Sequence, residues 1–469
     1  MNTVVTSQII YCAFLIFLSY YLCLVVFYLF QGLNGVFESK RRYYQNKEQD
    51  YTAQYLSSSI IPVTVIIPAH NEELWIRDSL LSVLNLNYPR CEVIVVDDAS
   101  TDGTFHILNE ILKLVQIDLY YPRHYPDVEI KSIYKSTVHK DVYVISNVSG
   151  KKKAGALNAA LDIAHGQYIC AMDADTVVEP DALLEVMAHI GRDPDGIIGA
   201  ESYFGLANGF IIKDGKIAKK QFSLNPIIAS QNLEYIRSFI GNRVAWSKYN
   251  AVPIIAGGFG VWRKDMLYAF GGYSSDFTCE DLEITFKAQD YISKKRGKGY
   301  RILSLPYCVG WTEGPSNIKS LVSQRERWQR VINETIWKYK YMMLNPKFGL
   351  FAFLTVPYYV LYEVFGVFFE IASIAFVTWG WLTGVLRLKT FLAFLALMIL
   401  AQSLISLISI FAIVRTQRVF KMKYILYLTF LTGTEFFWYR WILSIARFIG
   451  CLKTIMGVKS FTSYERSGR

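Results

Sequence analysis

The strongest constraint on this chain is a long apolar run near its N-terminus. Ile9 to Phe30 form an apolar run of 22 residues, inside a longer stretch from Asn2 to Phe37 that carries no charge. A helix of about 20 apolar residues spans the core of a bilayer, so this run predicts a transmembrane anchor. The run lacks the basic start and small-residue cleavage site of a removed signal peptide. Three basic residues, Lys40 to Arg42, follow it. The positive-inside rule therefore places this end in the cytoplasm and the N-terminus outside.

A second apolar block, from Gly349 to about Ile449, predicts further membrane helices. Thr390 to Val414 contains 25 residues without charge and is the clearest crossing. Its cytoplasmic end is marked by a basic cluster of Arg415, Arg418, Lys421 and Lys423. The preceding segment, Gly349 to Leu386, is too long for one straight helix. It predicts an interfacial or re-entrant piece followed by a crossing from Phe368 to Leu386.

The last part of this block, Tyr424 to Ile449, carries three ionisable residues, Glu435, Arg440 and Arg447. Ionisable side chains at membrane depth usually face a bundle interior or a polar path. They can also lie at the interface and extend their charged ends toward water. The sequence leaves both arrangements open.

The net charge and the cysteines bear on partners and compartment. The chain has 49 Lys and Arg against 39 Asp and Glu, and much of the excess lies beside the apolar segments, which indicates contact with anionic lipid headgroups. It has no zinc-finger spacing, basic helix or aromatic RNA-binding signature, so we expect no nucleic-acid partner. The seven cysteines form no C-x-x-C pair and are interpreted as reduced packing residues of a cytoplasmic domain.

Between the apolar blocks, strand-like runs alternate with helical segments. Four runs are rich in apolar residues: Val63–Ile67, Cys91–Val96, Val142–Ile145 and Tyr168–Met172. Because they are almost continuously apolar and are separated by helices, they predict a doubly wound, mostly parallel sheet of the α/β class. The stretch from Tyr120 to Asp141 is expected to be irregular. In such a sheet, the ligand site lies beyond the carboxyl ends of the strands.

The fourth run ends in Asp173-Ala174-Asp175. Two carboxylates spaced i, i+2 on an extended tip can both approach one hard cation, such as Mg²⁺ or Mn²⁺, that substrate phosphates also hold. By itself the pattern also fits a solvated turn, since Asp favours turns. Because other strand ends carry polar residues too, we interpret it as a clamp for a metal and a diphosphate. Asp175 is predicted to bind the metal, and Asp173 to face the nucleotide beside it.

Polar residues also follow the first two strands. Pro68 stiffens the exit of the first strand, and Glu72 either caps the next helix or lies where exposed backbone can hydrogen-bond a base. Asp97 and Asp98 follow the second strand, where a carboxylate can accept from a ribose hydroxyl or a base N–H. Lys153 lies at a helix start, where a lysine opposes the helix dipole. A phosphate bound there would interact favourably with both the lysine and the dipole.

A different pattern follows the fourth strand. Gln231 to Trp246 predicts a helix, and Ile254 to Trp262 predicts a strand whose three glycines allow a ligand close to the backbone. Glu280 and Asp281 open another helix. Acidic residues are common at that position because of the helix dipole. The functional alternative is that Asp281 is a general base that takes a proton from an acceptor hydroxyl.

Gln324, Arg327 and Trp328 lie at i, i+3 and i+4, which places them on one face of a helix. Arginine can bind a diphosphate by paired hydrogen bonds, and tryptophan offers an apolar plane to a sugar ring. The helix continues toward the second apolar block as a basic, amphipathic segment, which predicts a position at the membrane interface.

In this order, the motifs resemble those of the processive family 2 glycosyltransferases, which make poly-N-acetylglucosamine, cellulose, chitin and hyaluronan. The bacterial poly-N-acetylglucosamine synthases resemble the chain most. The resemblance covers about Val63 to Trp328 and the flanking membrane helices. It rests on Pro68-Ala-His-Asn-Glu72, Asp97-Asp98, Lys153-Ala-Gly-Ala-Leu-Asn158, Asp173-Ala-Asp175, Glu280-Asp281 and Gln324-x-x-Arg327-Trp328.

The resemblance implies a cytoplasmic GT-A domain, a UDP-sugar donor, a divalent cation, and an inverting reaction on a glycan or lipid-linked glycan acceptor. It also implies a multi-pass protein of the plasma membrane, with helices that form an export channel, and it leaves an accessory subunit or oligomer open. The roles it implies are nucleotide binding for Glu72, Asp97, Asp98 and Lys153, metal and diphosphate binding for Asp173 and Asp175, proton abstraction for Asp281, and acceptor and diphosphate binding for Glu280, Gln324, Arg327 and Trp328.

The chain departs from the family pattern at two places that carry no needed charge. Cys279 stands where threonine is common, and Ala256-Gly-Gly-Phe-Gly260 stands where Ser-Gly-Ala-Phe-Gly is common. The predicted division is an anchor (1–37), a linker (38–60), a GT-A domain (61–322), an interfacial helix (323–348), membrane helices (349–452) and a basic tail (453–469). Two alternatives remain: transfer of one sugar to a lipid-linked acceptor, and a membrane protein that only binds a nucleotide.

Overall fold

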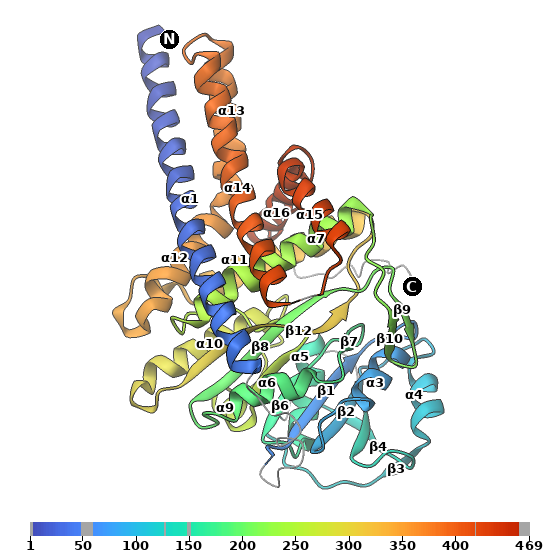
Figure 1. Ribbon diagram of the computed structural model, residues 1–469. Helices are drawn as coiled ribbons and strands as arrows, with labels where there is room; N and C mark the ends of the chain where they lie inside the picture. Colours follow the sequence, from blue (N-terminus) through green and yellow to red (C-terminus); the bar gives the residue numbers. More distant parts are fainter. Residues whose placement is uncertain (1–2, 48–59, 126–127, 148–151, 418, 459–469) are drawn as a thin grey trace.

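The computed structural model describes residues 3–47, 60–125, 128–147, 152–417 and 419–458. A sheet with helices on both faces forms the main body, and three helices project from it side by side (Figure 1). The projecting helices are α1 (Thr3–Lys47), α13 (Gly366–Leu382) and α14 (Leu388–Thr416). Residues 48–59 of the predicted linker, residues 148–151 before the predicted Lys153 helix, Arg418, and residues 459–469 of the predicted tail lie outside the described residues.

The main sheet has ten strands in the described residues, in the order β3-β4-β5-β2-β1-β6-β11-β8-β12-β7. The four predicted strands form its parallel centre, β5-β2-β1-β6, which agrees with the expected doubly wound core. The outer strands make the sheet mixed, because β3, β4, β7 and β11 pair antiparallel with their neighbours. The bounds are β1 Val63–Ala69, β2 Cys91–Asp97, β3 Leu114–Ile117, β4 Ile130–Ser136, β5 Val142–Asn147, β6 Tyr168–Ala171, β7 Val177–Val178, β8 Ile197–Leu206, β11 Gly260–Arg263 and β12 Arg301–Thr312.

One sequence prediction is wrong at the edge of the sheet. The stretch from Tyr120 to Asp141, expected to be irregular, contains β4, which pairs with β3 and β5. Strands β3 and β4 each carry two exposed residues, so they lack the continuous apolar run by which the central strands were found. The expected strand over Ile254–Trp262 is also shorter, because only Gly260–Arg263 is extended in the sheet.

Two apolar layers cover the faces of the sheet because alternate residues of each strand point to opposite sides. On one face, residues such as Val63 and Val95 pack with α3, α4, α6 and α7. On the other, residues such as Ile66 and Ile94 pack with α5, α9 and α10. The bounds are α3 Ile76–Leu84, α4 Thr104–Leu112, α5 Lys152–Ile163, α6 Ala182–Ile190, α7 Pro226–Ile236, α9 Lys264–Ala269 and α10 Asp281–Lys294, and a separate hairpin consists of β9 (Ile211–Lys213) and β10 (Lys216–Lys219).

The predicted helix over Gln231–Trp246 lies inside a longer helical stretch. It begins with α7, continues as a π-helical segment, Arg237–Arg243, and ends with α8, Val244–Ser247. The predicted interfacial helix is α11, Ile318–Lys338, which begins five residues before residue 323.

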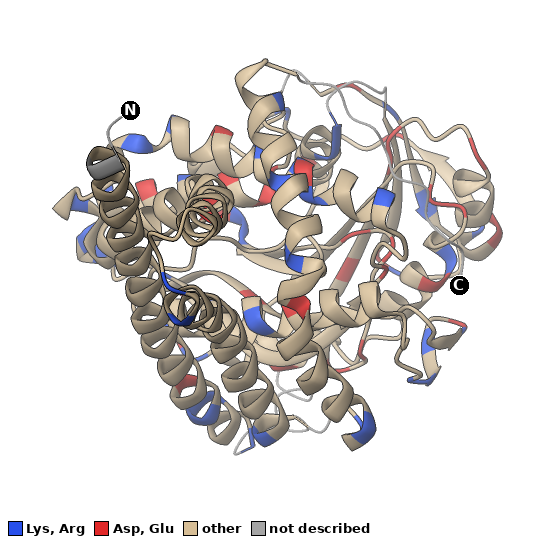
Figure 2. Cartoon of the chain, turned by 90° about the horizontal axis from the view of Figure 1, so that it is seen from above, with Lys and Arg blue, Asp and Glu red and all other residues tan. Residues whose placement is uncertain are grey.

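Two helices, α1 and α14, are long and apolar enough to cross a membrane, and they contain the two clearest predicted crossings. A third span is possible by length and composition, since Phe351–Val364 and α13 form a pair bent by 47°. This bend matches the expected re-entrant or interfacial piece followed by a crossing. Seen from above, the projecting helices carry few charged residues (Figure 2). Helix α1 continues to Lys47, into the segment predicted as a linker.

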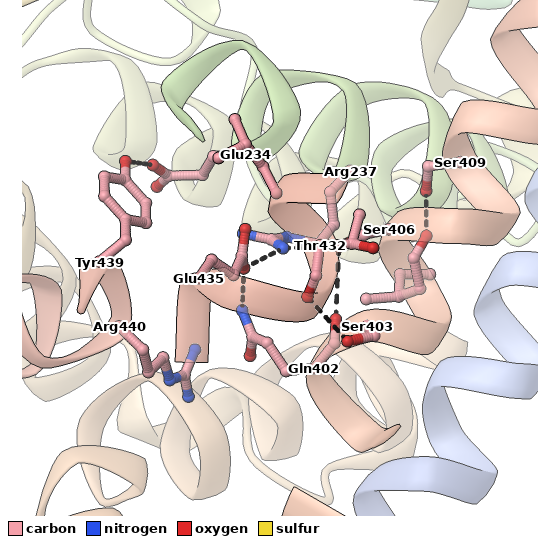
Figure 3. Close-up of polar contacts among 12 residues, drawn as sticks. Glu234, Arg237, Gln402, Ser403, Ser406, Ser409, Thr432, Glu435, Tyr439 and Arg440 are labelled. Carbon is pink, nitrogen blue, oxygen red and sulfur yellow. Dashed lines mark hydrogen bonds and ion pairs between the residues drawn. The ribbon is translucent and has the colours of Figure 1, made fainter. Parts of the chain in front are cut away.

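The ionisable residues of the last apolar segment face the interior of the helix assembly. Glu435 is buried, and it accepts hydrogen bonds from Arg237 Nη1 at 2.7 Å and Gln402 Nε2 at 2.6 Å (Figure 3). Arg440 pairs with Glu370 at 2.6 Å, and Arg447 with Glu363 at 2.9 Å. Of the two arrangements left open by the sequence, the structure has the interior one. These residues belong to or flank α15 (Met422–Thr434) and α16 (Tyr439–Ile455).

Candidate active site

The ends of three adjacent strands bring the first acidic residues to one edge of the sheet. Strand β1 lies between β2 and β6, both parallel to it, so Asp97 at the end of β2 and Asp173 just beyond β6 share that edge. Asp97 is buried and accepts a hydrogen bond from the Ser100 backbone N–H at 3.2 Å. It thereby shapes the turn after β2. The predicted convergence of strand ends is present in the structure.

Lys153 joins two of the predicted motifs. Its ammonium nitrogen lies 2.5 Å from Asp173 Oδ1 and 2.9 Å from Glu280 Oε1. Burial by itself lowers the pKa of Lys153, but the negative charges of Asp173 and Glu280 outweigh it and hold the pKa well above its ordinary value. Lys153 therefore stays a cation that holds the carboxylates of two distant motifs together. A bound phosphate would meet this positive charge near the start of α5.

Asp281 lies next to this cluster at the start of α10. Its carboxylate accepts hydrogen bonds from the backbone N–H of Leu282 at 2.8 Å and of Gly257 at 3.4 Å. Burial and the negative charge of Glu280 raise the pKa of Asp281 to about 6, although Lys153 opposes the shift. A carboxylate with a pKa near neutrality is suited to accept a proton during a reaction.

Gly257 allows the glycine loop to pack closely on these residues. A Cβ atom at this position would lie 2.6 Å from Lys153 Nζ, a distance that real contacts do not show. At Gly257 the close approach is made by Lys153, and the expected approach of a ligand stays a prediction.

Asp175, the predicted metal ligand, is buried, and its Oδ1 accepts a hydrogen bond from Thr312 Oγ1 at 3.0 Å. Thr312 ends β12, so a strand the sequence did not reveal orients this carboxylate. Among the described residues, no group of three or more His, Cys, Asp or Glu side chains is placed to hold a metal ion. Asp173 and Asp175 fit a hard cation that takes one or two carboxylates and completes its shell with substrate phosphates and water.

The residues predicted to surround the nucleotide form a linked pair of loops after β1 and β2. Asn71 Oδ1 accepts from the Thr101 backbone N–H at 2.7 Å, and the Glu72 N–H donates to Thr104 Oγ1 at 2.8 Å. Pro68 lies inside β1, and the Glu72 carbonyl accepts from the first N–H groups of α3. Burial raises the pKa of Asp98, and His70 Nδ1 lies 2.7 Å from its carbonyl oxygen. These loops lie at the same edge of the sheet as Asp173, because β1, β2 and β6 are parallel neighbours.

Helix α11 lies beside the Glu280-Asp281 turn. Glu334 on this helix accepts hydrogen bonds from the Thr278 N–H at 2.8 Å and hydroxyl at 2.7 Å. Burial raises the pKa of the Cys279 thiol to about 12, and the positive charge of Arg327 opposes the shift. Arg327 of α11 therefore acts electrostatically on the residue that precedes Glu280.

Gln324 and Trp328 are held by a residue that the sequence analysis did not select. Arg325 donates to Gln324 Oε1, and its guanidinium carbon lies 3.9 Å from the centre of the Trp328 ring. Arg325 is itself held by Glu234 of α7 at 2.8 Å, and Glu234 also accepts from the Tyr439 hydroxyl at 2.8 Å (Figure 3). The arginine between the two motif residues was a visible signal, but its partner is 91 positions away.

Comparison with known proteins identifies the family. The model of glycosyl transferase family 2 matches residues 64–249, and that of glycosyl transferase family group 2 matches residues 168–442, more than half of the chain. The chain belongs to glycosyl transferase family group 2. The match extends from β6 through α11 into α16, so the family pattern of this glycosyltransferase includes α13 and α14 but not α1.

Relatives of this glycosyltransferase agree with the resemblance found in the sequence. It is 25% identical over 361 residues to the poly-beta-1,6-N-acetyl-D-glucosamine synthase of Staphylococcus aureus (strain COL), covering 77% of the chain and 72% of that protein. It is 28% identical over 299 residues to the probable glycosyltransferase YdaM of Bacillus subtilis (strain 168), covering 62% and 61%. The predicted similarity to poly-N-acetylglucosamine synthases is confirmed.

A solved structure supports the predicted fold. The mannosyltransferase PcManGT from Pyrobaculum calidifontis, in complex with GDP-Man and Mn²⁺, superposes with a TM-score of 0.55 at 18% identity. The superposition covers 94% of this chain and 99% of that one. The GT-A-like α/β class of the sheet domain is thereby confirmed.

The contacts of Arg325 lead to a first prediction. The substitution Arg325→Met removes the guanidinium group that contacts both Gln324 and Trp328. Small misplacements of binding groups lower a reaction rate by up to about 100-fold. We expect kcat to fall by about ten- to 100-fold while the affinity for donor stays the same. Steady-state kinetics and donor titration measure the two quantities. Arg325→Lys keeps the charge and should recover part of the rate. A fall in donor affinity equal to the fall in kcat would contradict this positioning role.

Proposed function

We propose that this glycosyltransferase transfers N-acetylglucosamine from a UDP-sugar to a growing polysaccharide and forms β-linkages. The observation that carries the proposal is the cluster in which Lys153 joins Asp173 to Glu280 beside Asp281. Similarity to a poly-beta-1,6-N-acetyl-D-glucosamine synthase supports the choice of sugar. The protein is proposed to be a multi-pass protein of the plasma membrane with a cytoplasmic sheet domain.

The proposed reaction is a single displacement. Asp281 takes the proton of the acceptor hydroxyl, whose oxygen forms a bond to the anomeric carbon of the donor. The bond from that carbon to the diphosphate oxygen breaks, and the electron pair leaves with UDP. Attack from the opposite side converts an α-linked donor into a β-linked product. Arg327 and Lys153 supply fixed positive charge toward the leaving diphosphate.

A divalent cation, Mg²⁺ or Mn²⁺, would be held by Asp175 and Asp173. When bound, it would neutralise charge on the diphosphate as a Lewis acid. The hydrogen bond from Thr312 orients the Asp175 carboxylate for this role. Glu72, Asp97 and Asp98 are proposed to line the nucleotide part of the donor, and Gln324 and Trp328 the acceptor end of the glycan. Glu280 would hold the Lys153 ammonium group in position.

The helices are proposed to carry the growing chain outward. Support comes from the contact network that joins the sheet domain to the helix assembly, in which Arg237 of the π-helical segment pairs with Glu435. Membrane lipids would surround α1, α13 and α14. An accessory membrane subunit or an oligomer is compatible with this arrangement.

The decisive experiment measures UDP release by the full-length protein with a panel of UDP-sugars and either cation, followed by sizing of labelled product. We expect release with UDP-N-acetylglucosamine and a long product. A short, lipid-extractable product would favour single transfer instead. No release with any donor would leave only nucleotide binding.

The raised pKa of Asp281 predicts the pH dependence. The base must be ionised to accept a proton. Because the pKa of Asp281 is about 6, the ionised fraction of its carboxylate falls as the pH drops below that value. We therefore expect kcat/KM to be level above pH 7 and to fall about tenfold per pH unit well below pH 6. Initial rates between pH 5 and 8 test this, with donor affinity measured over the same range. A rate that stays level to pH 5 would exclude Asp281 as the base.

A further inference from the structure

A cavity of about 250 Å³ lies between the end of α1 and the sheet domain. Five cationic side chains line it, from α1, from the residues just after α6 and α8, and from β12, whereas no aspartate or glutamate is among its described lining residues. The cations are Arg41, Arg42, Arg192, Lys248 and Arg301. Nothing in the proposed transfer reaction uses them.

Two carboxylates behind the cavity wall hold some of these cations in place. Glu38 pairs with Arg41 at 2.6 Å and with Arg42 at 2.8 Å, and Asp193 pairs with Arg301 at 2.9 Å. The fold thus brings five positive charges around one cavity. The two carboxylates pair with three of these cations. An anion in the cavity would relieve the repulsion between them.

A buried histidine, His189, also lines the cavity. His189 is almost fully buried, and its Nε2 lies 3.1 Å from the Tyr307 hydroxyl. Burial lowers the pKa of His189 to about 3, and the charges of Arg42 and Arg192 act in the same direction. His189 is therefore neutral, and the wall obtains its charge from arginine and lysine alone.

The cavity lies far from the candidate active site. Ile197 and Arg301, which line or border it, are the first residues of β8 and β12, and these two strands are parallel. Thr312, which contacts Asp175, is the last residue of β12. A strand of that length spans more than about 30 Å, so the cavity is at the opposite edge of the sheet from Asp175.

The cavity also lies beyond the apolar run of α1. Arg41 follows Phe30, the end of the apolar run, by 11 residues of the same helix. At a rise of 1.5 Å per residue, this places Arg41 about 16 Å beyond the run along the helix axis. Arg41 thus lies beyond the predicted hydrocarbon core, on the side of the sheet domain, where a soluble anion can reach it.

We propose that this cavity is a second ligand site, which binds a small soluble anion that carries phosphate groups. The arginine fork matches phosphate oxygens by paired hydrogen bonds, and arginines from three separate segments of the chain line the cavity. The ligand would connect α1 with α6 and β12, and it would thereby stabilise the contact between the anchor helix and the sheet domain. The inference does not depend on the donor sugar or on the reaction proposed above.

The test uses full-length protein in detergent with EDTA and radiolabelled inorganic pyrophosphate as the probe, measured by equilibrium dialysis. We expect about one site per chain. Arg192→Ala and Arg301→Ala should each weaken binding by about tenfold, the loss expected for a charged hydrogen bond. Asp175→Asn, at the opposite edge, should bind as the natural chain does.

Arg77→Ala is a matched control for Arg301→Ala. Arg77 pairs with Glu110 at 2.8 Å, and their side-chain exposures of 45% and 53% resemble the 48% and 38% of Arg301 and Asp193. Thermal unfolding of each variant checks that it is folded, and Arg301→Lys should bind with intermediate affinity. Absence of binding at millimolar pyrophosphate, equal affinity of all variants, or loss of binding in Asp175→Asn would overturn the proposal. If anionic lipid nanodiscs raise the thermal unfolding temperature of the protein and pyrophosphate does not, the cavity binds a lipid headgroup. That result would also overturn the proposal.

Discussion

Asp281→Asn should reduce transfer by about 10³-fold or more while leaving donor affinity nearly unchanged, since a general base contributes up to about 10⁴-fold. Asparagine keeps the volume and one oxygen, which can accept the 2.8 Å hydrogen bond from the Leu282 N–H. The longer contact of the Gly257 N–H, at 3.4 Å, goes to the other carboxylate oxygen and is lost, so the turn should keep most of its shape. It cannot accept the acceptor proton. The contacts of Lys153 with Asp173 and Glu280 do not include Asp281, so the donor side is expected to remain intact.

The measurement pairs single-turnover transfer with UDP titration in the same preparation. Asp290→Asn is a matched control, because it removes one carboxylate from the same helix, where Asp290 pairs with Lys294 at 2.6 Å. That variant should retain full activity. Loss of UDP binding in Asp281→Asn would move Asp281 from proton transfer to donor binding. Transfer at the natural rate would remove it from the reaction altogether.

The sequence allowed prediction of the parts whose signal is local. The four central strands are nearly continuous buried apolar runs, and the crossings in α1 and α14 are long runs without charge. The Asp173-Ala-Asp175 motif could be placed because it directly follows such a strand. In these cases, one segment of the chain contains both the structural and the chemical information.

The two longest strands could not be predicted because buried polar residues interrupt their apolar pattern. Strand β8 contains Glu201, which is fully buried and pairs with Arg243 at 2.9 Å, and β12 contains the buried Ser304. A carboxylate in a run reads as exposed until its partner is known. Thr312 and the Glu234–Arg325 pair could not be predicted for the same reason. Thr312 contacts Asp175, and Glu234 contacts Arg325, from distant positions in the chain. Long-range pairing is what the single sequence lacks.

Among these long-range contacts, those of Lys153 have the next largest expected effect on the reaction. Lys153→Met removes the cation between Asp173 and Glu280 and leaves them, with Asp281, as three carboxylates close together. Loss of one fixed charge that stabilises a transition state costs about 10²- to 10³-fold in rate. We expect that loss in kcat, measured with saturating donor and acceptor.

The same variant should also shift the pH profile, which separates an electrostatic role from a structural one. Lys153 lowers the pKa of Asp281, so its removal raises that pKa above about 6, and the rate should begin to fall at a higher pH than in the natural chain. Lys131→Met, an exposed lysine on β4, should leave both rate and profile unchanged. A slower enzyme with an unmoved profile would mean that Lys153 only shapes the loop around Gly257. A moved profile requires that its charge reaches Asp281, which is the coupling between the donor clamp and the base that the geometry indicates.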